Sequence, residues 1–218
     1  LVVGLLLLIA LSPLMLLIAL LIKLTSPGPA LFRQVRGGLR GKPFPLVKFR
    51  TMRGDREPDA KELVPLEHPE VTRLGRWLRR LKLDELPQLI HVVRGEMSLV
   101  GPRPTLLDQS EAYDDFRRQR LLVRPGVTGL AQVYSHALAS WDERILYDIA
   151  YVRRCRFTLD LWILLRSVWV VIRGERHTAR PFRQTRFARY VEIPDGYGEA
   201  TDAAAPGVPV TNSAIPPR

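Results

Sequence analysis

The sequence has little cysteine and an uneven distribution of charge. Cys155 is the single cysteine among 218 residues, which excludes an internal disulfide and any multi-cysteine zinc site. Residues 1–22 carry no charged side chain at all. The last 28 residues hold four acids and one base, a net charge of −3, whereas the whole chain has a net charge of +11. The segment between them therefore carries +14, which indicates a polyanionic partner such as nucleic acid, anionic lipid or a phosphorylated substrate.

The uncharged segment at residues 1–22 is almost wholly apolar. As a straight helix it would extend about 33 Å, roughly the hydrocarbon thickness of a bilayer, so we expect it to insert into a membrane. A signal peptide is disfavoured, because no basic stretch precedes the segment and no A-x-A-like cleavage site follows it. The chain starts at Leu1 rather than at a methionine, so we expect a fragment or a processed protein.

Ser12 and Pro13 interrupt this helix near its midpoint. Proline removes one helical hydrogen bond and clashes with the carbonyl four residues back, which favours a kink. In lipid the freed carbonyl needs an internal partner, and the Ser12 hydroxyl is one local candidate. We therefore expect a re-entrant helix with both ends on one face of the membrane, and a conventional span is the alternative. All 33 basic residues follow the helix, which favours the cytoplasmic side for the rest of the chain.

We expect an α+β chain, mainly helical, in which the breaker sequence at residues 25–29 ends the membrane helix. Prolines and small polar residues beyond Tyr190 predict a disordered tail. The expected divisions are a membrane-inserted helix at 1–24, a compact cytoplasmic catalytic domain at 25–190 and a tail at 191–218.

Within the expected domain, two short strands at 31–36 and 44–52 are predicted to form a hairpin. Its cationic side carries Arg33, Arg36, Lys48 and Arg50, and a solvated basic face beside anionic lipid is the simplest interpretation of these charges. Further helices are expected at 106–122, 141–154 and 158–172, with a short extended piece at 130–134. The last of these helices is apolar nearly all round and too short to span, so we expect it to be buried or to lie at the bilayer interface.

Asp84 and Glu85 stand between two helical patterns. Upstream, apolar residues at i, i+3, i+4 and i+7 predict an amphipathic helix, namely Leu74, Trp77, Leu78 and Leu81. A second apolar stripe starts at Leu86 and ends at Gly95. A helix N-terminus stabilises a carboxylate and can bind phosphate, and adjacent acids can divide the tasks of attacking phosphorus and holding a divalent cation. Ordinary helix capping by the two acids is the alternative.

Arg103 lies between Pro102 and Pro104, which restrict its backbone and bias it towards an extended conformation. A guanidinium presented in this rigid way is a good bidentate ligand for phosphate. The sequence therefore predicts an anion site at this proline-flanked arginine.

Taken together, these motifs resemble those of the monotopic phosphoglycosyl transferases, also called bacterial sugar transferases. The resemblance covers about residues 1–172 and rests on the order of the motifs rather than on any one of them. In family order they are the apolar helix broken at Ser12-Pro13, Ser26-Pro27-Gly28-Pro29 with Phe32-Arg33-Gln34, Lys48-Phe49-Arg50-Thr51-Met52, Thr72-Arg73-Leu74-Gly75-Arg76, Leu83-Asp84-Glu85-Leu86-Pro87-Gln88-Leu89, Gly95-Glu96-Met97-Ser98-Leu99-Val100-Gly101-Pro102-Arg103-Pro104, Arg124-Pro125-Gly126-Val127-Thr128-Gly129-Leu130-Ala131-Gln132-Val133, and Asp148 with Tyr151-Val152.

The resemblance implies two displacements at phosphorus. Asp84 would attack the sugar-side phosphate of a nucleotide-diphosphate sugar, usually a UDP-sugar, and release UMP. A polyprenyl phosphate, typically undecaprenyl phosphate, would then accept the phosphosugar and so start a cell-surface glycan. The implied location is the bacterial inner membrane. The resemblance leaves open an oligomer and contact with downstream glycosyltransferases.

The resemblance also implies roles for single residues. Glu85 would hold Mg²⁺, and Lys48 would belong to the catalytic cleft. Arg103 would face the nucleotide phosphate or uridine. Asp148 would support the site by pairing with a base or by helping to position the metal. The flanking Pro102 and Pro104, with Arg33, Arg36 and Arg50 of the hairpin, complete the expected substrate-binding set.

The chain departs from the family at residues 134–136, where Tyr-Ser-His replaces the usual Asn-Gly-Arg. If that arginine binds substrate, His136 is a weaker, pH-dependent replacement. One alternative function is therefore a membrane scaffold for glycan assembly with impaired catalysis. A membrane-tethered nucleic-acid-binding protein is the other, although aromatic residues interleaved with basic ones on strands are lacking.

Overall fold

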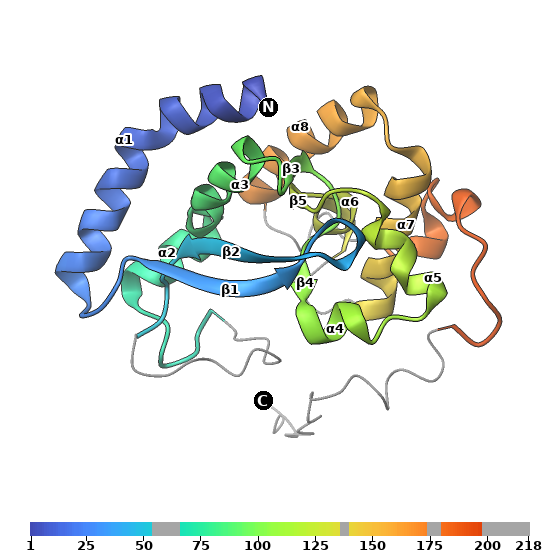
Figure 1. Ribbon diagram of the computed structural model, residues 1–218, viewed down its shortest axis with the longest axis horizontal. Helices are drawn as coiled ribbons and strands as arrows, with labels where there is room; N and C mark the ends of the chain where they lie inside the picture. Colours follow the sequence, from blue (N-terminus) through green and yellow to red (C-terminus); the bar gives the residue numbers. More distant parts are fainter. Residues whose placement is uncertain (54–65, 136–139, 174–179, 198–218) are drawn as a thin grey trace, which may run out of the picture.

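One long apolar helix, α1, begins the chain and bends along the outside of the molecule (Figure 1). The computed structural model describes residues 1–53, 66–135, 140–173 and 180–197, and α1 is Val2–Thr25. The Ser12 hydroxyl donates a hydrogen bond of 2.7 Å to the carbonyl of Ile9, which is the carbonyl that Pro13 leaves without an amide donor. The predicted local partner is therefore confirmed. By its length and composition α1 could cross a membrane.

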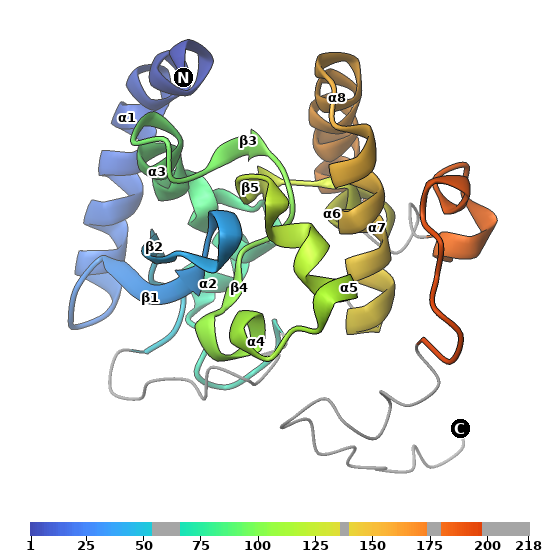
Figure 2. The same cartoon turned by 45° about the vertical axis from the view of Figure 1, so that its right-hand side comes forward.

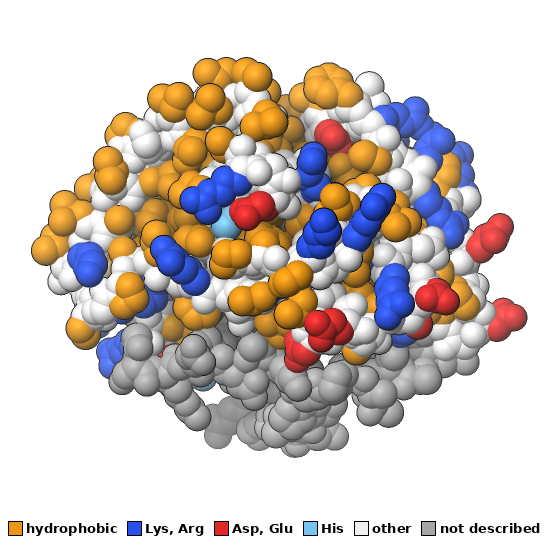
Figure 3. All heavy atoms as spheres, viewed as in Figure 1, with side chains coloured by type: hydrophobic (Ala, Val, Ile, Leu, Met, Phe, Trp, Pro, Cys, Tyr) orange, Lys and Arg blue, Asp and Glu red, His pale blue; other side chains and the backbone are white. Residues whose placement is uncertain are grey.

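Both halves of α1 contact the rest of the chain. In the C-terminal half, Ile18 and Ile22 are buried in a cluster with Phe49. In the N-terminal half Gly4 is buried, and a Cβ built on it would lie 2.7 Å from Cγ1 of Val92. Most other side chains of the helix are exposed, and Figure 3 shows hydrophobic side chains gathered along it. The helix therefore packs at both ends on one body while it leaves a long apolar surface uncovered.

A β-hairpin follows α1, as predicted. β1 (Leu31–Gly37) pairs antiparallel with β2 (Pro43–Phe49), and a 3₁₀ turn, η1 (Leu39–Gly41), joins them. β4 (Thr105–Leu106) pairs with the end of β1, which gives a sheet of order β2-β1-β4. β2 ends three residues before the predicted end at residue 52.

Two helical segments flank Asp84 and Glu85, as predicted. α2 (Arg73–Arg80) is followed by a 3₁₀ helix, η2 (Leu83–Gln88), and by the short α3 (Leu89–Val93). Both acids lie in the first turn of η2, yet no side chain forms a capping hydrogen bond there. The N-cap residues of η2 and α3 are Lys82 and Gln88, so neither acid occupies an N-cap position of these two helices.

The prediction of one continuous helix at residues 106–122 is also wrong. The segment contains α4 (Leu107–Glu111), α5 (Asp115–Arg118) and the 3₁₀ helix η3 (Gln119–Leu122). The break occurs at Asp114, whose carboxylate accepts a hydrogen bond of 2.7 Å from a backbone N–H in α5. A side chain that caps in this way starts a new helix and ends the previous one.

The extended piece expected at residues 130–134 is instead a helix, α6 (Leu130–Tyr134). Four of its five side chains are buried in the core cluster shared with the later helices. A short apolar run carries no period that separates strand from helix, so packing decides its conformation. The strand of this region lies just upstream, where β5 (Gly126–Thr128) pairs in parallel with β3 (Ser98–Val100).

The last two predicted helices are confirmed as α7 (Trp141–Arg154) and α8 (Phe157–Arg173). They form the largest core cluster together with α6, and Tyr147, Ile149 and Ile163 are fully buried in it. α8 is buried on one side only. Its other side exposes apolar residues at helical spacing, namely Phe157, Leu161, Leu165, Val168 and Ile172.

Two 3₁₀ turns, η5 (Phe182–Gln184) and η6 (Ala188–Tyr190), complete the described fold. Val191 is buried in the cluster around α7, so the described beginning of the expected tail packs on the domain. Residues 198–218 of that tail lie outside the described residues. Figure 2 shows α1 and α3 on one side of the molecule and α7 and α8 on the other, with the strands between them.

Candidate active site

A pocket rich in cationic side chains lies where the hairpin meets η2. Its lining residues are Arg36, Leu46, Lys48, Gln88, Arg103 and Pro104. The register of the hairpin explains why its three lining residues point into one pocket. Lys48 lies opposite Phe32, and Leu46 lies opposite Gln34. Residues that are directly opposite, or two apart along a strand, share one face of a sheet. Arg36 therefore projects from the same face as Lys48.

The Asp84 carboxylate lies among the positive charges of Lys48, Arg103 and Arg79. Asp84 is 7% exposed, and burial, followed by the negative charge of Glu85, raises its pKa. The positive charges of Lys48, Arg103 and Arg79 act in the opposite direction. Across the described residues, no side chain forms a hydrogen bond or an ion pair with this carboxylate. A carboxylate in this state is available to attack an electrophile.

The neighbouring Glu85 carboxylate is held by Arg103. Nη2 of Arg103 donates a hydrogen bond of 2.7 Å to Oε1 of Glu85. Burial alone would raise the pKa of Glu85, but the charge and hydrogen bond of Arg103, followed by the charges of Lys82 and Lys48, lower it. The structure therefore separates the two adjacent acids, since the pKa of Asp84 is raised and the pKa of Glu85 is lowered.

The cations of the pocket repel one another. Burial, followed by the charge of Arg103, lowers the pKa of Lys48 to about 8. The same two causes, in the same order, lower the pKa of Arg36 to about 10. Positive charges that are buried together favour any anion that enters between them. The pocket is therefore suited to a phosphate or diphosphate group.

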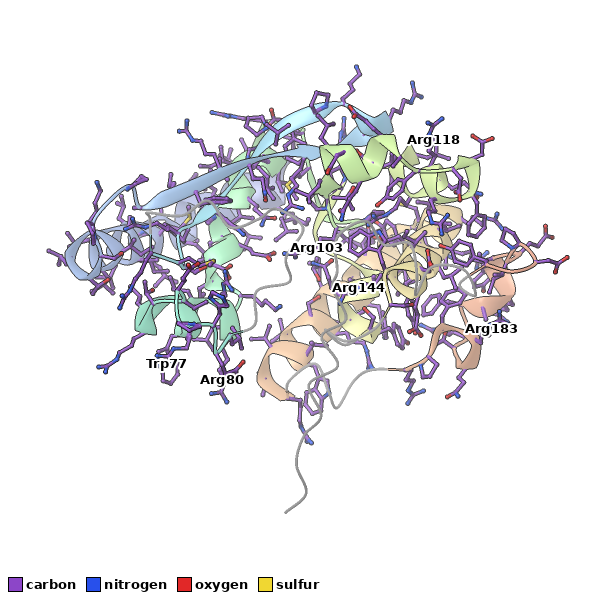
Figure 4. The ribbon with its side chains drawn as sticks, turned by 90° about the horizontal axis from the view of Figure 1, so that it is seen from below. Trp77, Arg80, Arg103, Arg118, Arg144 and Arg183 are labelled. Atoms are coloured by element: carbon purple, nitrogen blue, oxygen red, sulfur yellow. The ribbon has the colours of Figure 1, made fainter. Side chains whose placement is uncertain are left out.

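Arg103 combines a fixed backbone with an accessible side chain. Its side chain is 46% exposed, and Figure 4 shows it near the middle of the molecule, whereas Trp77 and Arg80 of α2 lie towards the edge. The flanking Pro102 carbonyl accepts a hydrogen bond of 2.9 Å from the N–H of Gly126, while Pro104 lines the pocket. Arg103 can therefore reach a bound anion from a loop that is tied to β5.

Two cations of the predicted binding set do not line the pocket. Arg33 is exposed and lies opposite Val47, so it projects from the other face of the hairpin. Arg50 is buried, and its guanidinium bonds the Ser26 carbonyl at 2.9 Å, the Ser26 hydroxyl at 2.8 Å and the Pro27 carbonyl. Arg50 thus anchors the turn after α1. Substrate contact by either arginine stays a prediction, and His136 lies outside the described residues.

Asp148 lies behind the pocket rather than in its lining. It is 1% exposed, and its Oδ2 accepts a hydrogen bond of 2.5 Å from Arg120. Burial raises the pKa of Asp148, and the charge of Arg120 opposes that shift. Of the two roles left open for this acid, the contact with a basic side chain is the one present in the fold.

Sequence reasoning missed three residues of this region. Gln88 lines the pocket and stands in the same motif as Asp84, four residues later, so helical spacing was a usable signal. Arg79 acts on the pKa of Asp84 from the preceding helix, among several similar arginines that sequence cannot separate. Arg120 is far from Asp148 in sequence, and no pattern pairs them.

The carboxylate chemistry of this site is compatible with a divalent cation whose other ligands come from the substrate. Among the described residues there is no group of three or more His, Cys, Asp or Glu side chains placed to hold a metal. Mg²⁺, however, is commonly held by one or two carboxylates, with water and substrate phosphates as the remaining ligands. Glu85 is one carboxylate of that kind, beside the Asp84 carboxylate.

The chain is similar to known proteins over most of its length. The family model described as "Bacterial sugar transferase" matches residues 1–174. A protein of Bacillus subtilis (strain 168) described as the uncharacterized sugar transferase EpsL is 43% identical over 154 residues, which cover 71% of this chain and 75% of that protein.

Two relatives with specific names are longer than this chain. The UDP-glucose:undecaprenyl-phosphate glucose-1-phosphate transferase of Caulobacter vibrioides is 47% identical over 170 residues, which cover 72% of this chain and 62% of that protein. The UDP-N-acetylgalactosamine-undecaprenyl-phosphate N-acetylgalactosaminephosphotransferase of Aeromonas hydrophila is 39% identical over 169 residues, which cover 75% of this chain and 40% of that protein. The chain therefore spans less than two thirds of either of them.

Proposed function

The chain belongs to the bacterial sugar transferase family, and on that basis we propose that it transfers a sugar 1-phosphate from a UDP-sugar to undecaprenyl phosphate. Relatives carry names for this reaction with glucose or N-acetylgalactosamine as the sugar. The observation that carries the proposal is the placement of the Asp84 carboxylate, which has no side-chain hydrogen bond within the described residues, among cations and beside the Glu85–Arg103 pair. Such a carboxylate suits attack on a diphosphate.

In the first step, an oxygen of the Asp84 carboxylate attacks the phosphorus nearer the sugar. The new O–P bond forms while the bond from that phosphorus to the bridging oxygen breaks, and UMP leaves with that oxygen. Phosphoryl transfer needs alignment and charge neutralisation more than proton transfer. Lys48, Arg36 and Arg103 supply positive charge from two sides of the pocket.

In the second step, an oxygen of the polyprenyl phosphate attacks the same phosphorus, and the bond to Asp84 breaks. The product is a polyprenyl diphosphate sugar, and Asp84 returns to its carboxylate form. The attacking lipid phosphate and the leaving carboxylate are both anions, so this step requires no proton donor or acceptor.

A divalent cation fits the donor set of this site. Glu85, with its lowered pKa, would hold Mg²⁺ together with oxygens of the substrate diphosphate. When bound, the ion would neutralise charge on those oxygens.

We further propose that α1 is re-entrant and that the domain lies on the cytoplasmic face of the inner membrane. A straight crossing helix would carry residue 4 about 27 Å away from residue 22, to the other side of the bilayer. The packing of Gly4 on Val92 and of Ile22 beside Phe49 supports a helix that returns to one side. The exposed Trp77 of α2 and the exposed apolar side of α8 provide further contacts for an interface.

The proposal is tested by nucleoside monophosphate release. The whole chain, in detergent or in native membranes, is mixed with a panel of UDP-sugars, with and without polyprenyl phosphate. We expect UMP from at least one donor, with sustained turnover only when the lipid is present. A chain that releases no UMP from any nucleotide sugar, while it remains folded, would support the scaffold function and overturn the proposal. Retention on a nucleic-acid column at physiological salt would favour the nucleic-acid-binding alternative.

A further inference from the structure

A buried ion pair stands behind Arg103. Arg120 is 2% exposed and Asp148 is 1% exposed, and Nη2 of Arg120 donates a hydrogen bond of 2.5 Å to Oδ2 of Asp148. Removing two charges from water is costly, and a well-packed apolar pair at such a place is often as stable. A requirement for stability alone is therefore a weak explanation for this pair.

Arg120 also bonds the backbone of the loop that carries Arg103. The same Nη2 donates a hydrogen bond of 2.9 Å to the Arg103 carbonyl, and Nη1 donates one of 2.7 Å to the Tyr113 hydroxyl. Arg103 in turn donates to Glu85 at 2.7 Å. A continuous series of contacts thus runs from Asp148 in α7, through Arg120, to the acid pair.

We propose that Arg120 is a positioning residue for the transfer reaction and that Asp148 acts through it, without touching substrate. Asp148 fixes the Arg120 guanidinium, and the guanidinium fixes the carbonyl of Arg103. Without the hydrogen bond from Arg120 to the Arg103 carbonyl, the Arg103 side chain would lose its alignment with Glu85 and with the donor diphosphate. The proposal rests on the proposed function, because it assigns the reaction that this alignment serves.

A second arginine–aspartate pair joins the same region to α7 and provides a matched control. Arg117 of α5 donates to Oδ1 of Asp142 through Nη2 at 2.9 Å and through Nε at 3.2 Å. Within the described chain, its other hydrogen-bond partner is Asp114, and its guanidinium stacks on Tyr197. The Arg117–Asp142 pair therefore ties α5, the element next to η3, to α7, and the hydrogen bonds that the Arg117 guanidinium makes within the described chain do not reach the Arg103 loop.

The test replaces each pair by apolar residues in the whole chain. Arg120→Met with Asp148→Leu removes both buried charges at once. No unpaired buried charge is then left to destabilise the folded state. Arg120→Lys is the second variant, since an ammonium retains the charge next to Asp148 but loses the planar fork that reaches both Arg103 and Tyr113. The control is Arg117→Met with Asp142→Leu. The measurements are the melting temperature, the binding of UDP by calorimetry, and kcat/KM for donor and for lipid.

We expect both Arg120 variants to melt near the wild-type temperature and to lose about 100-fold in kcat/KM for the donor, the effect of a misplacement of about 1 Å. UDP binding should weaken, whereas kcat/KM for the lipid should hold, because the nucleotide has left before that step. The control should retain both kcat/KM values.

Folded Arg120 variants with wild-type UDP binding and donor kcat/KM would overturn the inference and leave the proposed function intact. An equal loss in the control, or a loss that only follows the melting temperature, would also overturn it, because the pair would then be merely structural. A wild-type chain that neither binds UDP nor releases UMP would overturn the proposed function and this inference together.

Discussion

The Arg103 guanidinium donates a hydrogen bond of 2.7 Å to Glu85, and through this contact two adjacent acids of similar burial acquire different proton affinities. Asp84 is 7% exposed and Glu85 is 8% exposed. Burial, with the charge of Glu85, raises the pKa of Asp84, whereas Arg103 outweighs burial and lowers the pKa of Glu85. A pair of acids whose pKa values are pushed apart in this way is suited to two different tasks.

Asp84 is predicted to be the nucleophile. Asp84→Asn should abolish turnover and also the phosphosugar adduct that intact-mass analysis detects after mixing with donor alone, because an amide is a far weaker nucleophile at phosphorus. Asp115→Asn, at an exposed acid of α5, is the matched control and should leave both readouts unchanged. If Asp84→Asn retains more than a tenth of the rate, a loss below about 1.4 kcal/mol, another group must attack.

Glu85 is predicted to ligate Mg²⁺. Glu85→Gln should raise the Mg²⁺ concentration that gives half-maximal activity, because a neutral amide binds a hard cation more weakly than a carboxylate does. The measurement is a Mg²⁺ titration of UMP release at saturating donor. The exposed Glu111→Gln serves as the control. A Glu85→Gln titration that overlays the wild-type curve would remove Glu85 from the metal site.

Lys48 is predicted to give activity an alkaline limit. Burial, followed by the charge of Arg103, lowers its pKa to about 8, so the ammonium that neutralises the diphosphate is lost as the pH rises through that value. We expect kcat/KM for the donor to fall there. Lys48→Arg should remove the limit because a guanidinium stays charged, while Lys42→Arg, at the exposed end of the hairpin, should not.

The sign of the stability change separates this titration from unfolding. Since the folded pKa of Lys48 is about 8 and its ordinary value is 10.5, the unfolded chain binds more protons between these values. The contribution of Lys48 to the free energy of unfolding therefore rises with pH between about 8 and 10.5, the range in which activity falls. A melting temperature that drops together with activity above pH 8 would assign the alkaline limit to unfolding instead.

The order of substrate binding follows from the covalent step. If Asp84 takes the phosphosugar before the lipid binds, UMP leaves first, and double-reciprocal plots at several lipid concentrations should be parallel. Intersecting lines would indicate a ternary complex with direct transfer to the lipid, and Asp84 would then be a supporting residue.

Sequence patterns predicted the parts of this fold in which apolar residues recur at a regular spacing or in which proline and glycine interrupt a helix. Residues 141–154 have a helical period, and the predicted bounds agree with those of α7. Residues 106–122 look helical throughout, and the break is marked by Asp114, whose carboxylate accepts a hydrogen bond from the backbone N–H of Arg117. The six-residue stretch at Leu83–Gln88 was located from sequence because its acids sit between two periodic segments.

The supporting contacts of the site could not be predicted in the same way. Arg120 and Asp148 stand 28 residues apart in the chain, and their pairing depends on how η3 packs on α7. Nothing in the local sequence distinguishes Arg120 from neighbouring arginines that stay exposed, such as Arg118. The role of Arg33 was hard to separate from that of Lys48 for a related reason, because the element that packs on a hairpin decides which of its two faces holds the pocket. Arg50 differs in another way, since it bonds the turn after α1.

The last prediction concerns the course of α1 through the membrane. Its apolar length is enough to cross, but Pro13 bends it, and the Ser12 hydroxyl satisfies the Ile9 carbonyl that the proline frees. The polar group that a kink would leave exposed to lipid is thus paired within the helix. Gly4 then allows the N-terminal half to approach Val92 closely, which a helix that ended on the far side of the bilayer could not do.

Accessibility of the N-terminal end decides between the two courses. In a Cys155→Ser background, we expect a new cysteine at Val2 to resist an impermeant thiol reagent in intact cells and to react once the inner membrane is permeabilised. A cysteine placed at the exposed Asp115 in the same background reports the cytoplasmic side and should behave in the same way. Labelling at Val2, but not at Asp115, in intact cells would mean that the helix crosses the membrane. The contact between Gly4 and Val92 could not then exist in the membrane-bound protein.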